Sequence, residues 1–227
     1  MKKRNNADVL PSLVELQGKK VADIGCGNGA LVRLMTRHGA KVIGVECNPD
    51  QLEKARQAKP AGDEIYYEGV AEDLPFDDNK MDVIVFFNSL HHVDVANLEK
   101  ALSEAARALK PEGVLYVSEP IAEGGHFELM KPVHDETVVR DAAYKAVQSA
   151  DQFGLAEETE TTYIHDSKYP DFAAFKERML TVNPAIIDSF STLEPSLQQA
   201  FDTLGEGTVD GRTFDQPMRV NLLRKLG

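Results

Sequence analysis

Apolar and polar positions change period along the first half of the chain, and the change predicts short strands separated by helices. One apolar run covers both faces of its segment, which is typical of a central parallel strand with helices on each side. The predicted strands are residues 20–24, 41–46, 64–70, 81–89 and 114–118, of which 81–89 is the run that is apolar on both faces. The sequence KPEG at residues 110–113 predicts a turn before the last of them.

Between these strands, apolar residues return every three or four positions, as on one face of an amphipathic helix. Residues 30–38 show this spacing. Asn48, Pro49 and Gln51 suit the N-cap, the first helical position and the capping-box position of the next helix. Asp94 is the predicted cap of a further helix.

Strands that alternate with helices predict an α/β fold with a doubly wound parallel sheet and right-handed crossovers. In such sheets, ligands bind beyond the carboxyl ends of the strands. Glycine-rich or polar segments follow all five predicted strands, so we expect them to form one cleft. These segments are residues 25–29, Glu46, residues 70–74, residues 88–92 and Glu119.

The second half of the chain has a different pattern. Residues 127–153 are mostly helical, and a strand-like alternation follows at 155–164. Residues 171–204 are helical again, and 213–226 close the chain with a second strand-like alternation. This predicts two further strands, seven in all, on either side of a helical insertion at about 166–212 that lies over the cleft as a lid.

Composition narrows the possible partners. The chain has 227 residues with 25 Lys and Arg against 37 Asp and Glu, a net charge of −12, which disfavours a nucleic-acid partner. No apolar run approaches the length of a membrane-spanning helix, so no membrane insertion is expected. Cys26 and Cys47 lack CxxC spacing, and no secretory signal precedes them, which favours a reducing cytoplasmic location over a disulfide.

Three glycines at alternate positions form what we call the glycine turn, residues 25–29, directly after the first strand. Glycine there permits a positive φ and a close approach to the backbone, and a helix N-terminus follows. Glu46 ends the next strand about twenty residues later, where an acid binds ribose hydroxyls in nucleotide-binding folds. These features predict a nucleoside ligand, and a dinucleotide is one candidate.

The spacing of the turn favours another ligand. Gly25, Gly27 and Gly29 give GxGxG rather than GxGxxG, and Asp23 precedes them. A carboxylate at this position would repel a pyrophosphate and attract an amino group. Residues 21 to about 120 resemble the class I S-adenosylmethionine-dependent methyltransferases, in particular the small-molecule group that includes quinone-biosynthesis enzymes. The matching pieces are VADIGCGNG, VIGVECNPDQLEKAR, GVAEDLPFDDNKMDVIVFFNSLHHV and LKPEGVLYVSEP.

The resemblance implies a Rossmann-like methyltransferase fold, which is a doubly wound, mostly parallel seven-stranded sheet with an antiparallel last strand. It implies a single domain over 1–227, with a cofactor-binding half at 1–120 and a substrate half at 121–227 that carries the helical lid insertion. The cofactor would be S-adenosyl-L-methionine, and the partner would be a small-molecule methyl acceptor.

The resemblance also implies roles on the methionine and ribose side. The glycine turn would let the methionine part of the cofactor lie against the backbone, with Asp23 near its amino group. Glu46 would accept hydrogen bonds from both ribose hydroxyls. Asn88 and Leu90 would border the methionine and the sulfonium.

On the adenine side, Cys47 would line the pocket, while the backbone N–H of Ala71 and the side chain of Glu72 would lie at the adenine edge. Members of the family often have Asp where this chain has Val70. Glu72 or Asp73 is therefore the expected acceptor for the adenine amino group.

A general base is needed only if the acceptor must lose a proton. His91 and Glu119, which follow the fourth and fifth strands, are the catalytic candidates, and a structural role is the alternative for each. The run His134-Asp135-Glu136 invites a metal site, but consecutive helix side chains point in different directions, so no metal is predicted.

Two other functions remain open at this point. One is a scaffold that binds S-adenosylmethionine without turnover, and the less favoured one is a nicotinamide-dependent oxidoreductase. O-, N- and C-methyltransferases share the same cofactor half, so neither the acceptor nor the oligomeric state follows from the sequence.

Overall fold

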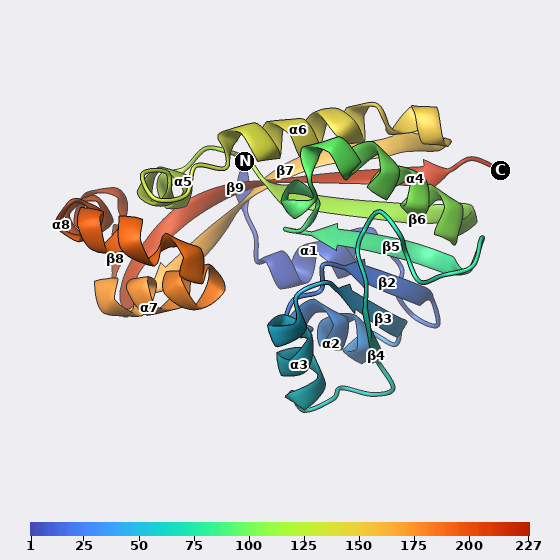
Figure 1. Cartoon of the computed structure of the whole chain (residues 1–227), viewed down its shortest axis with the longest axis horizontal. Coiled ribbons are helices and arrows are strands. Elements are labelled where there is room, and N and C mark those ends of the chain that lie inside the picture. Colours follow the sequence, from blue (N-terminus) through green and yellow to red (C-terminus); the bar gives the residue numbers. More distant parts are fainter. The chain divides into compact units, whose positions relative to one another are not determined.

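Nine β-strands and eight α-helices make up the computed structural model, which describes residues 1–227 (Figure 1). The chain folds into two units. The larger unit comprises residues 6–119, 139–161 and 219–227, and the smaller comprises residues 1–5, 120–138 and 162–218.

The larger unit contains β2 to β5, nearly all of β6 and parts of β7 and β9, which pair in the order β7-β9-β6-β5-β2-β3-β4. The pairs β6·β5, β5·β2, β2·β3 and β3·β4 are parallel, and Figure 1 shows the arrowhead of β9 pointing opposite to that of β5. The predicted mostly parallel sheet with an antiparallel last strand is confirmed, but the sheet has nine strands rather than the predicted seven, because it includes two short strands that were not predicted. The strands are β2 (Lys20–Ile24), β3 (Lys41–Glu46), β4 (Ile65–Glu68), β5 (Met81–Phe87), β6 (Leu109–Pro120), β7 (Leu155–Tyr169) and β9 (Gly211–Lys225).

Helices lie on both faces of this sheet, as a doubly wound fold requires. Figure 1 shows α4 and α6 on one side and α1, α2 and α3 on the other. These helices are α1 (Asn6–Leu13), α2 (Ala30–Arg37), α3 (Pro49–Gln57), α4 (Leu98–Ala108) and α6 (Thr137–Gln148), and the short 3-10 turns are η1 (Leu90–His92), η2 (Val95–Asn97) and η3 (Ala150–Phe153). None of the helices combines the length and apolar character needed to cross a bilayer.

Capping residues and strand register account for the boundaries of several helices and strands. The side chain of Asn48 accepts hydrogen bonds from the backbone N–H groups of Asp50 (2.9 Å) and Gln51 (3.2 Å), so the predicted cap of α3 is confirmed. Asp94 caps the short turn η2, which precedes α4, rather than α4 itself. Residues 110–113 loop out of β6, because Met81 pairs with Leu109 while Val83 pairs with Val114.

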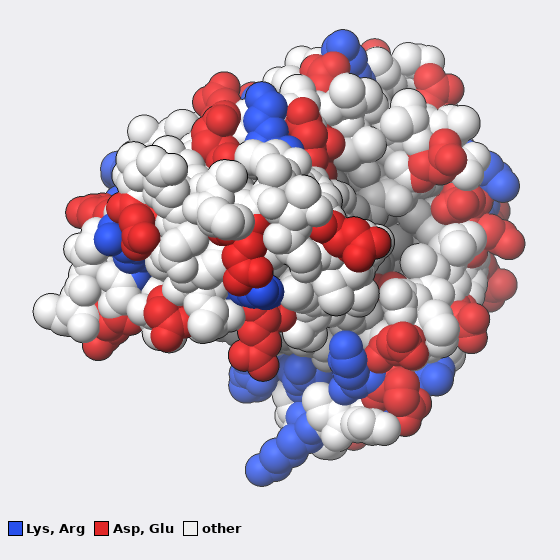
Figure 2. All heavy atoms as spheres, turned by 60° about the vertical axis from the view of Figure 1, so that its left-hand side comes forward, with Lys and Arg blue, Asp and Glu red and all other residues white.

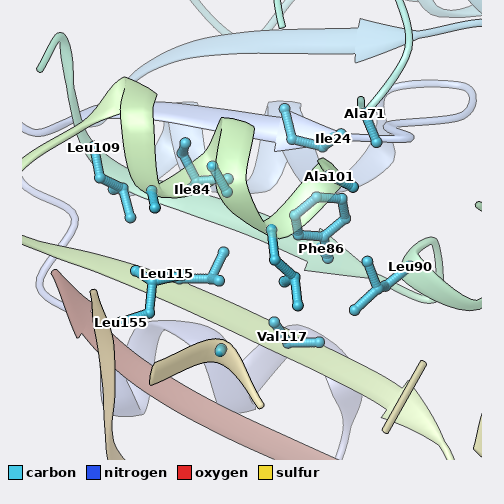
Figure 3. Close-up of a cluster of buried hydrophobic side chains, with 14 of the residues drawn as sticks. Ile24, Ala71, Ile84, Phe86, Leu90, Ala101, Leu109, Leu115, Val117 and Leu155 are labelled. Carbon is cyan, nitrogen blue, oxygen red and sulfur yellow. The ribbon is translucent and has the colours of Figure 1, made fainter. Parts of the chain in front are cut away.

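The core of the larger unit lies between β5, β6 and α4. Figure 3 shows Ile84, Phe86 and Leu115 in one cluster with side chains from α4 and β7, and all three are fully buried. A strand that is buried on both faces needs apolar residues at successive positions. That requirement explains the continuous apolar run of β5.

The smaller unit contains the helical insertion. Its helices are α5 (Gly125–Met130), α7 (Phe172–Val182), η4 (Pro184–Ile186) and α8 (Ile187–Leu204), and its short strands are β1 (Lys2–Lys3), which is parallel to β7, and β8 (Glu206–Thr208), which is antiparallel to β9. Phe175, Phe190 and Phe214 are fully buried in its aromatic core. The helices α7 and α8 fall within the predicted insertion, and their role as a lid stays a prediction.

Charge is spread over the surface. The face shown in Figure 2 carries Asp and Glu side chains across its whole extent, with Lys and Arg among them and a basic group at its lower edge. This distribution agrees with the net charge of −12.

Candidate functional site

The glycine turn folds back onto β3. The backbone N–H groups of Gly25 and Cys26 both donate to the carbonyl of Val45, at 2.8 and 3.1 Å. Gly25, Gly27 and Gly29 have φ values of 71°, 54° and 73°, a left-handed region that residues with a Cβ rarely adopt. The backbone geometry therefore explains why all three positions are glycine.

The three glycines differ in their surroundings. A Cβ on Gly25 would lie 2.6 Å from the Cβ of Ser89, and one on Gly29 would lie 2.5 Å from the hydroxyl of Tyr66. A Cβ on Gly27 would meet nothing within 4 Å. Gly25 and Gly29 thus allow close internal packing, while Gly27 presents bare backbone to open space, where a ligand can approach.

Glu46 joins the end of β3 to the glycine turn. Its Oε2 accepts a hydrogen bond from the N–H of Gly27 and its Oε1 accepts one from the N–H of Asn48, both at 2.8 Å. A carboxylate offers about four acceptor positions, and the thiol of Cys47 is a third, weaker donor, so about one position remains for other donors. Because Glu46 is only 7% exposed, a further donor would have to come from a ligand held close to the turn.

Asp23 is the second carboxylate of this site and is 2% exposed. Burial, and then the neighbouring charge of Glu46, raise the pKa of Asp23 from 3.8 to about 7. A cationic group bound beside Asp23 would favour its charged form. The pair is therefore suited to a ligand that carries an ammonium group.

The two cysteines differ in exposure. Cys47 is exposed, and its thiol lies 3.7 Å from Oε1 of Glu46. Burial and the charge of Glu46 raise the pKa of Cys47. Cys26 is buried, and the same two influences, together with Asp23, raise the pKa of its thiol. Both cysteines are free thiols.

The turn after β5 holds an unusual asparagine. Asn88 has a φ of 52°, and its backbone N–H donates to the carbonyl of Ser118 at 2.9 Å. Its side-chain Oδ1 is buried and has no hydrogen-bond partner. Buried polar atoms are rarely left unsatisfied, and strained backbone gathers at functional sites. A ligand that donates a hydrogen bond would satisfy Asn88.

The candidate catalytic residues are bound to each other. Oε2 of Glu119 is in short contact with Nδ1 of His91, whose ring is 4% exposed. Oε1 of Glu119 accepts hydrogen bonds from the N–H groups of Ser89 (3.0 Å) and Leu90 (2.8 Å). Both carboxylate oxygens of Glu119 therefore have partners within the chain.

The predicted adenine-side residues lie on a tight turn after β4. The N–H of Gly69 donates to the carbonyl of Glu46 at 3.2 Å, which holds this turn beside the end of β3. Ala71 is 8% exposed, and Oε1 of Glu72 accepts a hydrogen bond from the side chain of Asn97 at 3.3 Å. Val70 is exposed.

Leu90, predicted to border the sulfonium, has a fully buried side chain within the apolar cluster of Figure 3. Its side chain therefore contributes to the core. All the predicted cofactor-binding residues belong to the larger unit and lie at or just after the carboxyl ends of β2 to β5.

The structure adds supporting residues that the sequence pattern did not single out. The hydroxyl of Ser89 donates to the carbonyl of Ile24 at 2.6 Å, and the guanidinium of Arg33 donates to the carbonyl of Asn28 at 2.9 Å. Tyr66 lies within 3 Å of where a Cβ on Gly44 would be. A glycine inside a predicted strand was the available signal, since it marks the close approach of another group.

Two other features lie apart from these residues. A hollow of about 380 Å³ is found at the amino ends of β2 to β5, the edge opposite to the glycine turn. In the smaller unit, the ring of His134 pairs with Glu136 at 2.9 Å, and Asp135 accepts a hydrogen bond from the N–H of Thr137. Neither feature includes a predicted cofactor-binding residue.

Comparison with known proteins finds methyltransferases. A family model described as "Methyltransferase domain" matches residues 22–117. An uncharacterized methyltransferase of Synechocystis is 34% identical over 105 residues, which are 46% of this chain and 49% of that protein. A demethylmenaquinone methyltransferase of Tropheryma whipplei is 38% identical over 102 residues, 45% of this chain and 42% of that protein.

A ubiquinone biosynthesis O-methyltransferase of Bartonella bacilliformis is 36% identical over 109 residues, 47% of this chain and 43% of that protein. The chain thus matches less than half the length of these relatives. Among solved structures, the YcgJ protein of Bacillus subtilis has a TM-score of 0.69 at 22% identity, covering 97% of this chain and 98% of that one. At this identity the likeness concerns the fold.

Proposed function

Because a family model described as "Methyltransferase domain" matches residues 22–117, we propose that the chain transfers a methyl group from S-adenosylmethionine to a small-molecule acceptor. The observation that carries the proposal is the bare backbone of Gly27, which faces open space beside the carboxylate of Glu46, with Asp23 buried nearby. This combination suits a ligand that has both an ammonium group and sugar hydroxyls.

The residues present fit the cofactor. S-adenosylmethionine, when bound, supplies a methyl group already activated by its sulfonium. Asp23 would receive the amino group, Glu46 the ribose hydroxyls, and Oδ1 of Asn88 a donor from the methionine end. Ala71 and Glu72 would lie at the adenine edge.

The protein's main task would be to hold and orient the reactants, since alignment alone can lower a barrier by several kcal/mol. For an acceptor that loses a proton, His91 is the proposed base. A carboxylate can only accept hydrogen bonds, so Glu119 fixes a proton on Nδ1 of His91. This contact would hold the imidazole of His91 in one tautomer.

Two observations support a small-molecule acceptor. The net charge of −12 disfavours a nucleic-acid substrate, and two of the relatives are named for reactions on quinones or their precursors. The family match also favours turnover over a role as a scaffold that binds the cofactor without reaction.

A screen with isotopically labelled methyl donor tests this function. We expect the purified protein, incubated with fractionated metabolite extract, to move the label onto one small molecule, which mass spectrometry would identify. Transfer to RNA or protein instead would contradict the acceptor class. If the donor binds and no fraction accepts the label, the scaffold alternative holds.

Alanine variants at two glycines distinguish the effect of backbone strain from the effect on ligand binding. Gly27 and Gly154 have φ values of 54° and 75°, and a Cβ on either would meet nothing within 4 Å. Gly27→Ala and Gly154→Ala should each destabilise the protein by about 1 kcal/mol through backbone strain. Only Gly27→Ala should weaken S-adenosylhomocysteine binding, by about tenfold or more, as measured by calorimetry. Equal affinities for the two variants would contradict the placement of the ligand at Gly27.

A further inference from the structure

We propose that Glu119 is a positioning residue of the cofactor site, which holds the turn at residues 88–91 against the glycine turn. The inference rests on the proposed function, because it concerns the same cofactor. It goes beyond that function in giving Glu119 a task that requires no contact with the acceptor.

Glu119 bonds to three groups of the turn at residues 88–91. Its Oε1 takes two consecutive backbone N–H groups, those of Ser89 and Leu90, and its Oε2 takes the ring of His91. Glu119 lies near the end of β6, whereas the turn follows β5. One carboxylate therefore fastens three successive residues of a neighbouring loop.

Ser89 links this turn to the glycine turn. The hydroxyl of Ser89 donates to the carbonyl of Ile24 at 2.6 Å, and Ser89 is 8% exposed. The Cβ of Ser89 would lie 2.6 Å from a Cβ placed on Gly25, so the two segments are in direct contact. Movement of Ser89 would therefore change the backbone that the cofactor is expected to touch.

Asn88 is held between these contacts. Asn88 keeps a left-handed φ of 52°, which is unfavourable unless its surroundings fix it. Its N–H is held by the carbonyl of Ser118, and the next residue along the chain is held by Glu119. These bonds on either side fix the backbone of Asn88, from which the side chain with the buried Oδ1 extends.

The binding of S-adenosylhomocysteine to three variants tests the proposal, by calorimetry at 10 °C after circular dichroism has shown each to be folded. Glu119→Ala removes all three bonds, so it should weaken binding about tenfold or more. Glu119→Gln keeps an oxygen that can accept from Ser89 and Leu90, so it should stay within about threefold of the wild type. Ser89→Ala breaks the link to Ile24 and should give an intermediate loss, which keeps the test valid if Glu119→Ala does not fold.

Glu64 offers a matched control. Its carboxylate accepts hydrogen bonds from the N–H groups of Ala61 (2.7 Å) and Gly62 (2.8 Å) in a loop that lacks predicted cofactor residues. Glu64→Ala should lower the melting temperature, because it frees a loop that a carboxylate holds through two backbone N–H groups. It should leave the affinity for S-adenosylhomocysteine unchanged, because that loop lies outside the predicted cofactor site. A purely structural effect of Glu119 would give the same result as this control.

The outcomes separate the two claims. Failure of the wild-type protein to bind S-adenosylhomocysteine would contradict the proposed function. Wild-type affinity in a folded Glu119→Ala or Ser89→Ala variant would overturn the positioning role alone. An equal, large loss in Glu119→Ala and Glu119→Gln would also overturn it, because the charge of Glu119 rather than its hold on the backbone would then matter.

Discussion

Asp23→Asn is expected to stabilise the ligand-free protein at pH 8, by up to about 4 kcal/mol, while weakening its binding of the cofactor. Asp23 is 2% exposed, and burial and then Glu46 raise its pKa from 3.8 to about 7. Above pH 7 the folded protein therefore carries a buried charge that the unfolded chain would hold in water. Asparagine has nearly the same shape and carries no charge.

The sign of the pH dependence follows from the direction of this shift. A raised pKa in the folded state favours folding fully below about pH 4, and this contribution is lost as the pH rises through about 7. Urea unfolding at pH 5 and pH 8 should show Asp23→Asn gaining stability over the wild type mainly at pH 8. A gain of equal size at both pH values would contradict the assigned titration.

Asp82→Asn is the matched control of opposite sign. Burial opposes the charged form of Asp82, but the hydrogen bonds from Lys110 and from the N–H of Lys20 outweigh it and lower the pKa of Asp82. A lowered pKa contributes stability above the unfolded value, which is lost as the pH falls. Asp82→Asn should therefore destabilise the protein at pH 8, in contrast to Asp23→Asn.

Asp23→Asn should also change the pH dependence of ligand binding. An ammonium group beside Asp23 favours its charged form, so binding should release a proton and tighten as the pH rises from 6 to 8. In Asp23→Asn, affinity for S-adenosylhomocysteine should fall about tenfold or more and lose this pH dependence. Calorimetry in two buffers with different ionisation enthalpies would measure the proton release directly.

Glu46→Ala is expected to cause the largest loss of affinity, about 3 kcal/mol or more than a hundredfold. The variant removes the acceptor for the ribose hydroxyls and also the bonds that hold Gly27 and Asn48. Because the charge of Glu46 helps to raise the pKa of Asp23, that pKa should fall as well. Calorimetric titration with S-adenosylhomocysteine measures the first effect.

Glu68→Ala controls for the loss of a negative charge at the same edge of the sheet. Glu68 pairs in register with Glu46, and its side chain is exposed. The Glu68→Ala variant should keep its affinity for S-adenosylhomocysteine within about twofold of the wild type, since an exposed charge is strongly screened. A loss as large as that of Glu46→Ala would indicate a general electrostatic effect and contradict the ribose role.

Much of the fold could be predicted from the sequence because local signals and burial agree. The strands at 20–24 and 41–46 match β2 and β3 at both ends, since each apolar run is bounded by polar residues or glycine. Asn48 caps α3 as its side-chain chemistry predicts. The third predicted strand, 64–70, is longer than the Ile65–Glu68 of β4, because its last residues already belong to the turn at Ala71.

The candidate site was less predictable where function depends on contacts distant in the sequence. Glycine spacing and the position of Glu46 identified the turn, because these features follow local rules for strand ends. The bonds from Glu119 to the turn at 88–91 join residues about thirty positions apart, and no periodic pattern encodes them. The left-handed φ of Asn88 likewise depends on the partners around it.

Titration of the wild-type protein with S-adenosylhomocysteine, and in parallel with NAD, tests the central claim most directly. We predict saturable one-to-one binding of S-adenosylhomocysteine by calorimetry, weakened about tenfold or more in Gly27→Ala and unchanged in Gly154→Ala, and no heat from NAD. Binding of NAD, or no binding of S-adenosylhomocysteine at pH 8, would contradict the account.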